Sequence, residues 1–174
     1  VGKLDDTIVI FLGEQGPQFP GGKWTLWNPG VSSALIARYP DRIRPGSRSD
    51  AIVQYEDPLP TFIDIAGGDP REELDGVSFK KALFGESGTA RKYAYGIHNN
   101  YPEGHPYPIR SIRDGRYALI LNLCPERQYH EKHLMAATGN KTGVWPTWQE
   151  AAKTDERSGY LCSRFVDRPA VEFY

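Results

Sequence analysis

The fold is decided by residues 7–30, which begin Thr7-Ile-Val-Ile-Phe-Leu-Gly-Glu-Gln-Gly16. The first five residues are β-branched or aromatic and almost wholly apolar, so they predict a strand buried on both faces, the usual state of a central parallel strand. Gly13-Glu14-Gln15-Gly16 then holds a carboxylate and an amide between two glycines. Because ligands of open α/β sheets bind outside the carboxyl ends of the strands, these polar residues mark a candidate site.

A second polar feature of this stretch is Lys23, which follows Gly21-Gly22 and precedes Trp24. Two hard oxygens close in sequence to a lone ammonium group suit a divalent cation beside a bound oxyanion. An ordinary loop with a surface lysine would have the same spacing, so that alternative stays open on the residues alone.

Motifs along the rest of the chain resemble, in order and spacing, the C-terminal portion of the sulfatases, a family of the alkaline-phosphatase-like superfamily. The subgroup that the chain resembles most contains heparan N-sulfatase (sulfamidase) and its bacterial relatives. The matching segments cover nearly the whole chain and include Asn28-Pro-Gly30, Ala34-Leu-Ile-Ala-Arg38, Pro40 to Gly46, Leu59 to Gly67, Leu74-Asp-Gly76, Ile109-Arg-Ser-Ile-Arg113 and Arg168 to Tyr174.

The resemblance implies an α/β fold in two parts. Residues 1–90 would form the distal part of the catalytic sheet-and-helix domain. Residues 91–174 would form a small α+β subdomain, an antiparallel sheet with one C-terminal helix. The chain is then expected to be the C-terminal part of a protein several hundred residues long, with its first residue a cut end.

Local signals predict the shorter elements. Asp57 is expected to cap a helix that packs an apolar stripe, including Leu59 and Phe62, against the sheet. Gly67-Gly68 is expected to end this helix. Asp114-Gly115 predicts a β-hairpin. Strands are also expected at 34–37, 51–55, 93–98 and 171–174, helices at 78–84 and 148–165, and an irregular stretch at 128–143.

Composition excludes several classes of protein. The 174 residues suit one ordinary domain with or without an appendage, and a net charge of −1 gives no reason to expect a nucleic-acid partner. No apolar run is long enough to span a membrane. Cys124 and Cys162 could pair in an oxidising compartment, but two cysteines make no disulfide framework, so unpaired thiols are expected. His130-x-x-His133 lacks the Glu and the third ligand of a zinc site.

The resemblance assigns a metal and a catalytic role to the strand-end loop. Glu14 and Gln15 take the position of the Asp-Asn or Asp-His pair that binds Ca²⁺ in sulfatases, and both keep an oxygen ligand on a side chain one methylene longer. Lys23 takes the position of the lysine that holds the sulfate group and neutralises charge as the S–O bond breaks. A strand-end Glu-Gln pair without a role is the alternative.

Three further residues are expected to contact substrate. Trp24 would wall the pocket or stack on a sugar ring, with core packing as an equal alternative. His98 matches a pocket-rim segment that contacts the sugar in the sulfamidase-like subgroup. Arg110 lies with Arg113 on one expected strand, where the two are expected to share a face. One of them would reach an anionic substrate group, although a salt bridge within the hairpin is favoured.

The implied function is hydrolysis of sulfate esters or N-sulfate (sulfamate) groups of sulfated sugars and glycosaminoglycans. Sulfatases use a formylglycine made from a Cys/Ser-x-Pro-x-Arg motif. Neither Cys124-Pro-Glu-Arg127 nor Cys162-Ser-Arg164 fits this motif, so the formylglycine is expected upstream and the chain alone is expected to be inactive.

The expected partners are therefore a sulfated carbohydrate and the missing N-terminal part of the same protein, with no nucleic acid and no membrane. The protein would be periplasmic or secreted in a bacterium and lysosomal in an animal. Two other functions remain open. One is a phosphoesterase or phosphonate hydrolase of the same superfamily, and the other is a non-catalytic glycan-binding module.

Overall fold

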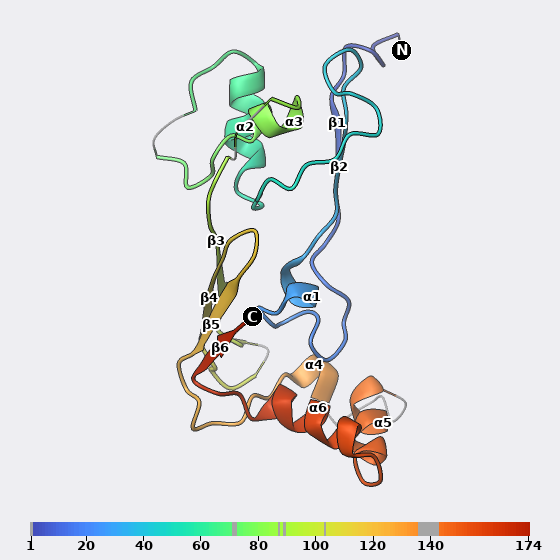
Figure 1. The fold of residues 1–174 in the computed structure, drawn as a ribbon, viewed down its shortest axis with the longest axis vertical. Coiled ribbons are helices and arrows are strands. Elements are labelled where there is room, and N and C mark those ends of the chain that lie inside the picture. Colours follow the sequence, from blue (N-terminus) through green and yellow to red (C-terminus); the bar gives the residue numbers. More distant parts are fainter. Residues whose placement is uncertain (1, 71–72, 87, 89, 103, 136–142) are drawn as a thin grey trace. The chain divides into compact units, whose positions relative to one another are not determined.

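A computed structural model describes residues 2–70, 73–86, 88, 90–102, 104–135 and 143–174 (Figure 1). The chain forms two compact units, and each is built from segments that are far apart in sequence. Unit 1 contains residues 1–13, 34–94 and 113–117, and unit 2 contains residues 14–33, 95–112 and 118–174. The predicted domains, residues 1–90 and 91–174, are a different kind of division, which remains a prediction.

Unit 1 begins with a two-stranded antiparallel ribbon. Strand β1 (Val9–Leu12) pairs with strand β2 (Leu35–Arg38), so that Val9 lies opposite Arg38. The side chains are not buried, since Phe11 is 57% exposed and Ile36 is 64% exposed. The prediction of a central parallel strand buried on both faces is therefore wrong within the described chain. A run of β-branched and apolar residues specifies an extended backbone, but it does not specify the partner strand or what covers the faces.

The helices of unit 1 are α2 (Pro58–Ile65) and α3 (Lys80–Leu83), which pack against each other. Helix α2 ends as expected, because Gly67 has a positive φ of 82° and the N–H of Gly68 donates to Ile63 O. The predicted stripe faces outward instead: Leu59 and Phe62 are exposed, while Pro60 and Thr61 are buried. The segment predicted as a strand at 51–55 contributes only an isolated bridge between Ile52 and Arg91.

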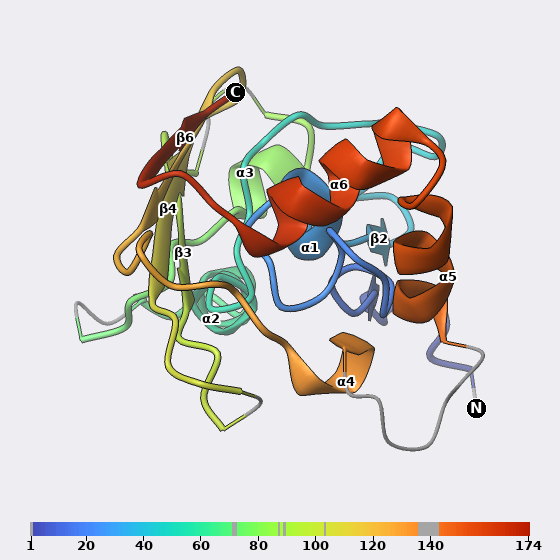
Figure 2. The same cartoon turned by 90° about the horizontal axis from the view of Figure 1, so that it is seen from below.

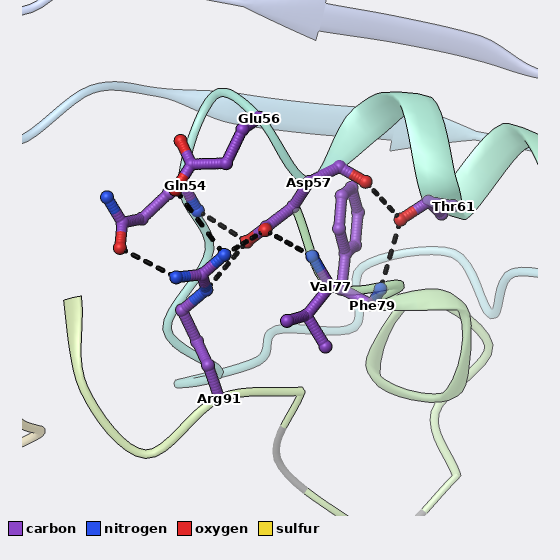
Figure 3. A network of polar contacts seen from close by, with 7 residues as sticks. All are labelled: Gln54, Glu56, Asp57, Thr61, Val77, Phe79 and Arg91. Carbon is purple, nitrogen blue, oxygen red and sulfur yellow. Dashed lines mark hydrogen bonds and ion pairs between the residues drawn. The ribbon is translucent and has the colours of Figure 1, made fainter. Parts of the chain in front are cut away.

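Asp57 organises unit 1, although not as the side-chain cap that the sequence predicts. Its buried carboxylate accepts the backbone N–H groups of Gln54 (2.7 Å) and Val77 (2.8 Å). Arg91 donates to it through both Nε and Nη2, and also lies 3.4 Å from Glu56 Oε1 (Figure 3). Both carboxylate oxygens are therefore engaged by Gln54, Val77 and Arg91, which explains why the side chain does not cap its own helix.

Thr61 extends this network into the interior of unit 1. Its hydroxyl donates to Asp57 O (2.7 Å) and accepts the N–H of Phe79 (3.0 Å), as Figure 3 shows. Phe79 is itself buried, so the segment before α3 is fixed to α2 by a hydrogen bond and by packing.

Unit 2 contains a four-stranded sheet in the order β3-β4-β5-β6. The strands are β3 (Ala94–His98), β4 (Ile109–Arg113), β5 (Ala118–Asn122) and β6 (Val171–Phe173). The β4–β5 turn is closed by the bond from Asp114 N to Tyr117 O, as the hairpin signal predicts. Ala94 and residues 113–117, which include the β4–β5 turn, are counted with unit 1. Strand β6 pairs antiparallel with β5 at the edge of the sheet, which confirms the predicted edge strand.

Among its described residues, unit 2 also contains the helices α1 (Asn28–Val31), α4 (Lys132–Met135), α5 (Val144–Ala151) and α6 (Glu156–Val166). The single predicted helix at 148–165 is wrong, because Asp155 caps α6 by accepting the N–H of Ser158 (2.7 Å) and so separates α6 from α5 (Figure 2). Helix α4 lies in the stretch predicted as irregular, of which residues 136–142 are outside the described residues. Among the described helices, none has both the length and the apolar content needed to cross a membrane.

The core of unit 2 is aromatic. Tyr129 meets the Tyr107 ring edge-to-face with centroids 5.3 Å apart, and the Phe165 ring at 5.5 Å. Trp145 packs on Phe165 from α5 at 5.3 Å. The other buried apolar members are Leu26, Ile109 and Ile120. The opposite face of the sheet is exposed, with Tyr95, Ile97, Leu121, Val171 and Phe173 on it.

Candidate functional site

The loop that carries Lys23 is shaped by close backbone contacts that only glycine permits. A β-carbon on Gly22 would lie 2.2 Å from Pro17 O, and the N–H of Lys23 donates to that same oxygen (3.0 Å). The buried hydroxyl of Thr25 donates to Gly22 O (2.8 Å). The two glycines before Lys23 therefore serve a tight turn that presents the lysine at a fixed position.

Lys23 and Glu14 form an ion pair within this loop. The ammonium nitrogen lies 2.7 Å from Glu14 Oε1; the lysine side chain is 23% exposed and the glutamate side chain is 70% exposed. A mostly covered cation thus faces a mostly solvated carboxylate. An arriving anion can replace Glu14 as the partner of Lys23 without leaving a buried charge behind.

The loop does not make a complete calcium site. Ca²⁺ takes six to eight oxygen ligands, whereas Glu14 and the half-buried Gln15 offer side-chain oxygens from only two residues. The glutamate is also already engaged with Lys23. Over the described ranges, no group of three or more His, Cys, Asp or Glu side chains could hold a metal ion. The chemistry of the donors fits calcium, but these two residues can supply only part of its coordination.

Trp24 follows Lys23 in the left-handed region, with φ of 64°. The indole stacks on the imidazole of His133, with centroids 5.2 Å apart and planes 15° apart. Glu131 positions this histidine, because its fully buried carboxylate accepts the N–H groups of His133 (3.0 Å) and Leu134 (2.9 Å) at the start of α4. The face of Trp24 that a sugar would use on this side is therefore covered by His133.

His98 lies at the end of β3 on the inner face of the sheet. A β-carbon on Gly96, two residues earlier, would lie 2.5 Å from the Ser111 hydroxyl and 3.1 Å from Leu26, which places this face toward the core. His98 Nε2 is 3.4 Å from the Tyr129 hydroxyl, and that hydroxyl donates to Trp24 O (2.6 Å). His98 and the Lys23–Trp24 turn thus meet through one tyrosine.

Arg110 is not brought to this cluster. It alternates along β4 with the buried Ile109 and Ser111, so it lies on the other face of the sheet from His98. Its Nη1 donates to Asn99 Oδ1 (2.9 Å) and to Ile109 O (2.8 Å). The expectation that Arg110 and Arg113 share a face is wrong, because residues three apart on a strand point to opposite sides. Burial lowers the pKa of the Arg113 guanidinium.

The buried guanidinium group of Arg168 packs against the ring of Tyr129. Arg168 is 3% exposed, and its guanidinium carbon is 3.8 Å from the centroid of the Tyr129 ring and 4.8 Å from that of Trp27. Its Nε donates to Phe165 O (3.1 Å). Burial lowers the pKa of this guanidinium, while the nearby Tyr129 and Glu172 act in the opposite direction.

Sequence reasoning missed Tyr129, Glu131 and Arg168 as parts of this cluster. Tyr129 is 105 residues from its partner Trp24, so no local pattern could have connected them. The predicted free thiols are confirmed, because Cys124 and Cys162 are both unpaired, and burial raises the pKa of Cys162.

Comparisons with known proteins agree on one family. The family model described as N-sulphoglucosamine sulphohydrolase, C-terminal, matches residues 21–136. An ulvan-active sulfatase of Formosa agariphila is 38% identical over 120 residues, which are 68% of this chain and 24% of that protein. Human N-sulphoglucosamine sulphohydrolase is 31% identical over 132 residues, which are 70% of this chain and 26% of that protein. The chain therefore spans about a quarter of the length of these relatives.

Solved structures show the same fold. A protein in complex with its substrate D-glucosamine-2-N,6-O-disulfate matches with a TM-score of 0.58 and 26% identity, over 94% of this chain and 34% of that one. A phosphonate monoester hydrolase from Silicibacter pomeroyi matches with a TM-score of 0.57 and 19% identity, over 96% of this chain and 37% of that one. The predicted α/β class and the sulfatase resemblance are thereby confirmed. The fold alone does not distinguish sulfate from phosphonate substrates.

Proposed function

The chain belongs to the N-sulphoglucosamine sulphohydrolase C-terminal family, and we propose that it is the C-terminal part of a sulfatase acting on sulfated sugars. The substrate would be a sulfate ester or an N-sulfate of a glucosamine-type sugar. The nucleophile would be a formylglycine in an upstream part of the protein. The observation that carries the proposal is the pair formed by Lys23 and Glu14 on the glycine-shaped turn beside Trp24.

Lys23 would act on the sulfate group directly. Its ammonium would donate to sulfate oxygens and offset the negative charge that grows as the S–O or S–N bond breaks. The partial covering of the lysine side chain strengthens this effect, because a cation with less water around it interacts more strongly with an anion. The exposed Glu14 would give up the lysine when the sulfate arrives.

Glu14 and Gln15 would then be available to a calcium ion that other ligands complete. Bound calcium would supply positive charge beside the sulfate. Lys23, freed from Glu14, would be held in place by the Gly22 turn and by Thr25. His98 and the face of Trp24 that His133 does not cover would form the sugar-facing edge of the site. The role of Arg110 in substrate binding also remains a proposal, and it requires a part of the substrate that reaches the other face of the sheet.

The first experiment is Lys23→Ala in the full-length protein, assayed for sulfate release from glucosamine N-sulfate and glucosamine 6-sulfate. We expect kcat to fall by roughly 10²–10³-fold, the size of effect seen when one transition-state donor is removed. Lys153→Ala is the matched control, because Lys153 also pairs with a glutamate, Glu150, but both side chains of that pair are mostly exposed. Full turnover by Lys23→Ala would remove this lysine from the site.

The same assay decides between the proposed function and its rivals. Faster hydrolysis of the corresponding phosphate or phosphonate ester would identify a phosphoesterase or phosphonate hydrolase. Glycan binding without turnover would indicate a non-catalytic module. The purified 174-residue chain is expected to release no sulfate, and measurable release would contradict the proposed upstream nucleophile.

A further inference from the structure

The Tyr129 hydroxyl connects the Lys23–Trp24 turn to the end of β3. Its O–H donates to Trp24 O at 2.6 Å, a short distance for a neutral donor and acceptor. The same hydroxyl oxygen lies 3.4 Å from His98 Nε2. Tyr129 therefore contacts two residues of the cluster from a fully buried position.

The Lys23–Trp24 turn needs a contact that holds its backbone conformation in place. Trp24 has a positive φ, which a side chain with a β-carbon adopts only when its surroundings hold it there. The carbonyl that Tyr129 binds belongs to this same residue, directly after Lys23. Loss of the bond would free the Trp24 peptide to rotate, and the lysine side chain would move with it.

Arg168 stabilises the position of the Tyr129 ring by a cation–π contact. Its guanidinium carbon is 3.8 Å from the Tyr129 ring centroid, within the range of a cation–π contact in a desolvated setting. A cation over the ring draws electron density from the phenol and makes its O–H a better hydrogen-bond donor. The edge-to-face contacts with Tyr107 and Phe165 fix the position of the ring.

We propose that Tyr129, supported by Arg168, is a positioning residue that holds the Lys23–Trp24 turn and His98 in the geometry needed for binding and cleavage of the sulfate group. Its influence on the reaction rests on the proposed function, whereas the anchoring of Trp24 does not. Tyr129 would act through Trp24 and Lys23 and would not touch the substrate itself.

The test is Tyr129→Phe in the full-length protein, compared with Tyr107→Phe. Tyr107 is the matched control, because it is a neighbouring buried tyrosine whose hydroxyl has no hydrogen-bond partner among the described residues. Each variant loses one buried oxygen and keeps the ring. Thermal unfolding of both variants checks that they fold.

Two readouts separate positioning from stability. The first is fluorine NMR of protein that contains fluorotryptophan, with the Trp24 signal identified by its loss in Trp24→Phe. That signal should shift or broaden in Tyr129→Phe and stay unchanged in Tyr107→Phe. The second is turnover: kcat should fall about tenfold or more in Tyr129→Phe while KM changes by less than about threefold, because a misplaced lysine mainly weakens transition-state stabilisation.

The outcomes separate the anchor from the proposed function. An unchanged Trp24 signal in Tyr129→Phe, or equal effects of the two tyrosine variants, overturns the inference. A shifted signal together with undiminished kcat overturns the positioning role in catalysis. A wild-type protein that cleaves no sulfated sugar, but in which only Tyr129→Phe shifts the Trp24 signal, would refute the proposed function and support the anchor.

Discussion

Each of the two units holds a largely covered arginine, Arg91 and Arg168, and the two guanidinium groups are stabilised in different ways. In unit 1, Arg91 donates to the fully buried carboxylate of Asp57, and the same carboxylate accepts two backbone N–H groups (Figure 3). In unit 2, Arg168 lies over the rings of Tyr129 and Trp27. The guanidinium group in unit 1 is stabilised by an ion pair, whereas the one in unit 2 is stabilised by the faces of aromatic rings.

This difference follows from what surrounds each guanidinium. Unit 1 offers little aromatic core, and its strands β1 and β2 leave Phe11 and Ile36 exposed. Unit 2 has a closed aromatic core, so a cation can be partly compensated by ring quadrupoles. A buried ion pair fails when one partner is lost, because the other charge is left uncompensated, whereas an aromatic environment tolerates an apolar replacement.

The largest expected effect is therefore that of Asp57→Ala in unit 1. It removes the buried carboxylate that Arg91 and two N–H groups share and leaves Arg91 with the more exposed Glu56, and we expect a loss of about 3–5 kcal/mol in the free energy of unfolding. Urea unfolding followed by circular dichroism would measure it. Asp64→Ala is the control, since the Asp64–Lys80 pair is about one-third exposed and should contribute no more than about 1 kcal/mol. Equal losses of unfolding free energy in the two variants would contradict the expectation that Asp57 contributes more to stability than Asp64.

The next largest loss of unfolding free energy is expected for Arg168→Met in unit 2. The variant loses the cation–π contacts and the bond to Phe165 O, but it also removes a buried charge and keeps most of the volume. We expect a net loss of about 1–2 kcal/mol, smaller than for Asp57→Ala. Arg164→Met, at a less buried guanidinium 5.0 Å from the Trp27 ring, should cost less again. An Arg168→Met loss above that of Asp57→Ala would reverse the comparison.

The smallest effect is a pH dependence at the cap of α6. Hydrogen bonds from the side chain and the N–H of Ser158 lower the pKa of Asp155 below its ordinary value of 3.8. The carboxylate thus stabilises the folded state above that ordinary pKa, and this contribution disappears as the pH falls through the lowered value. Helical circular dichroism between about pH 5 and pH 2 should show the loss. Asp155→Asn keeps a good capping residue without the charge, so this part of the pH dependence should vanish.

The accuracy of prediction from sequence depended on the distance between partners. The hairpin at Asp114-Gly115 and the Gly67-Gly68 helix end were predicted because their hydrogen bonds join residues a few positions apart. The break between α5 and α6 also had a local signal, Asp155 three residues before Ser158, which was overlooked in favour of a continuous apolar pattern. The ion pair between Asp57 and Arg91 had no local sequence signal, because the two residues are 34 positions apart.

The candidate site follows the same rule. The glycines, the lysine and the carboxylate of residues 13–23 could be singled out because they are neighbours in the chain, and the structure pairs Lys23 with Glu14. His98 was proposed through resemblance, and the structure places it on the same tyrosine as Trp24. Tyr129 could not be predicted, because its partners are 31 and 105 residues away and a buried tyrosine carries no local pattern.

The bond between Trp27 Nε1 and Glu172 Oε2, at 2.8 Å, joins residues that are 145 positions apart. During synthesis, the turn that carries Lys23 leaves the ribosome long before its last support, β6, has been made. At about 5–20 residues per second, the synthesis of the intervening 145 residues would take about 7–30 seconds. Such distant pairings also slow folding in general. The Trp27–Glu172 bond therefore cannot form until β6 has been synthesised, and translation pauses before β6 would prolong the exposure of the aromatic core.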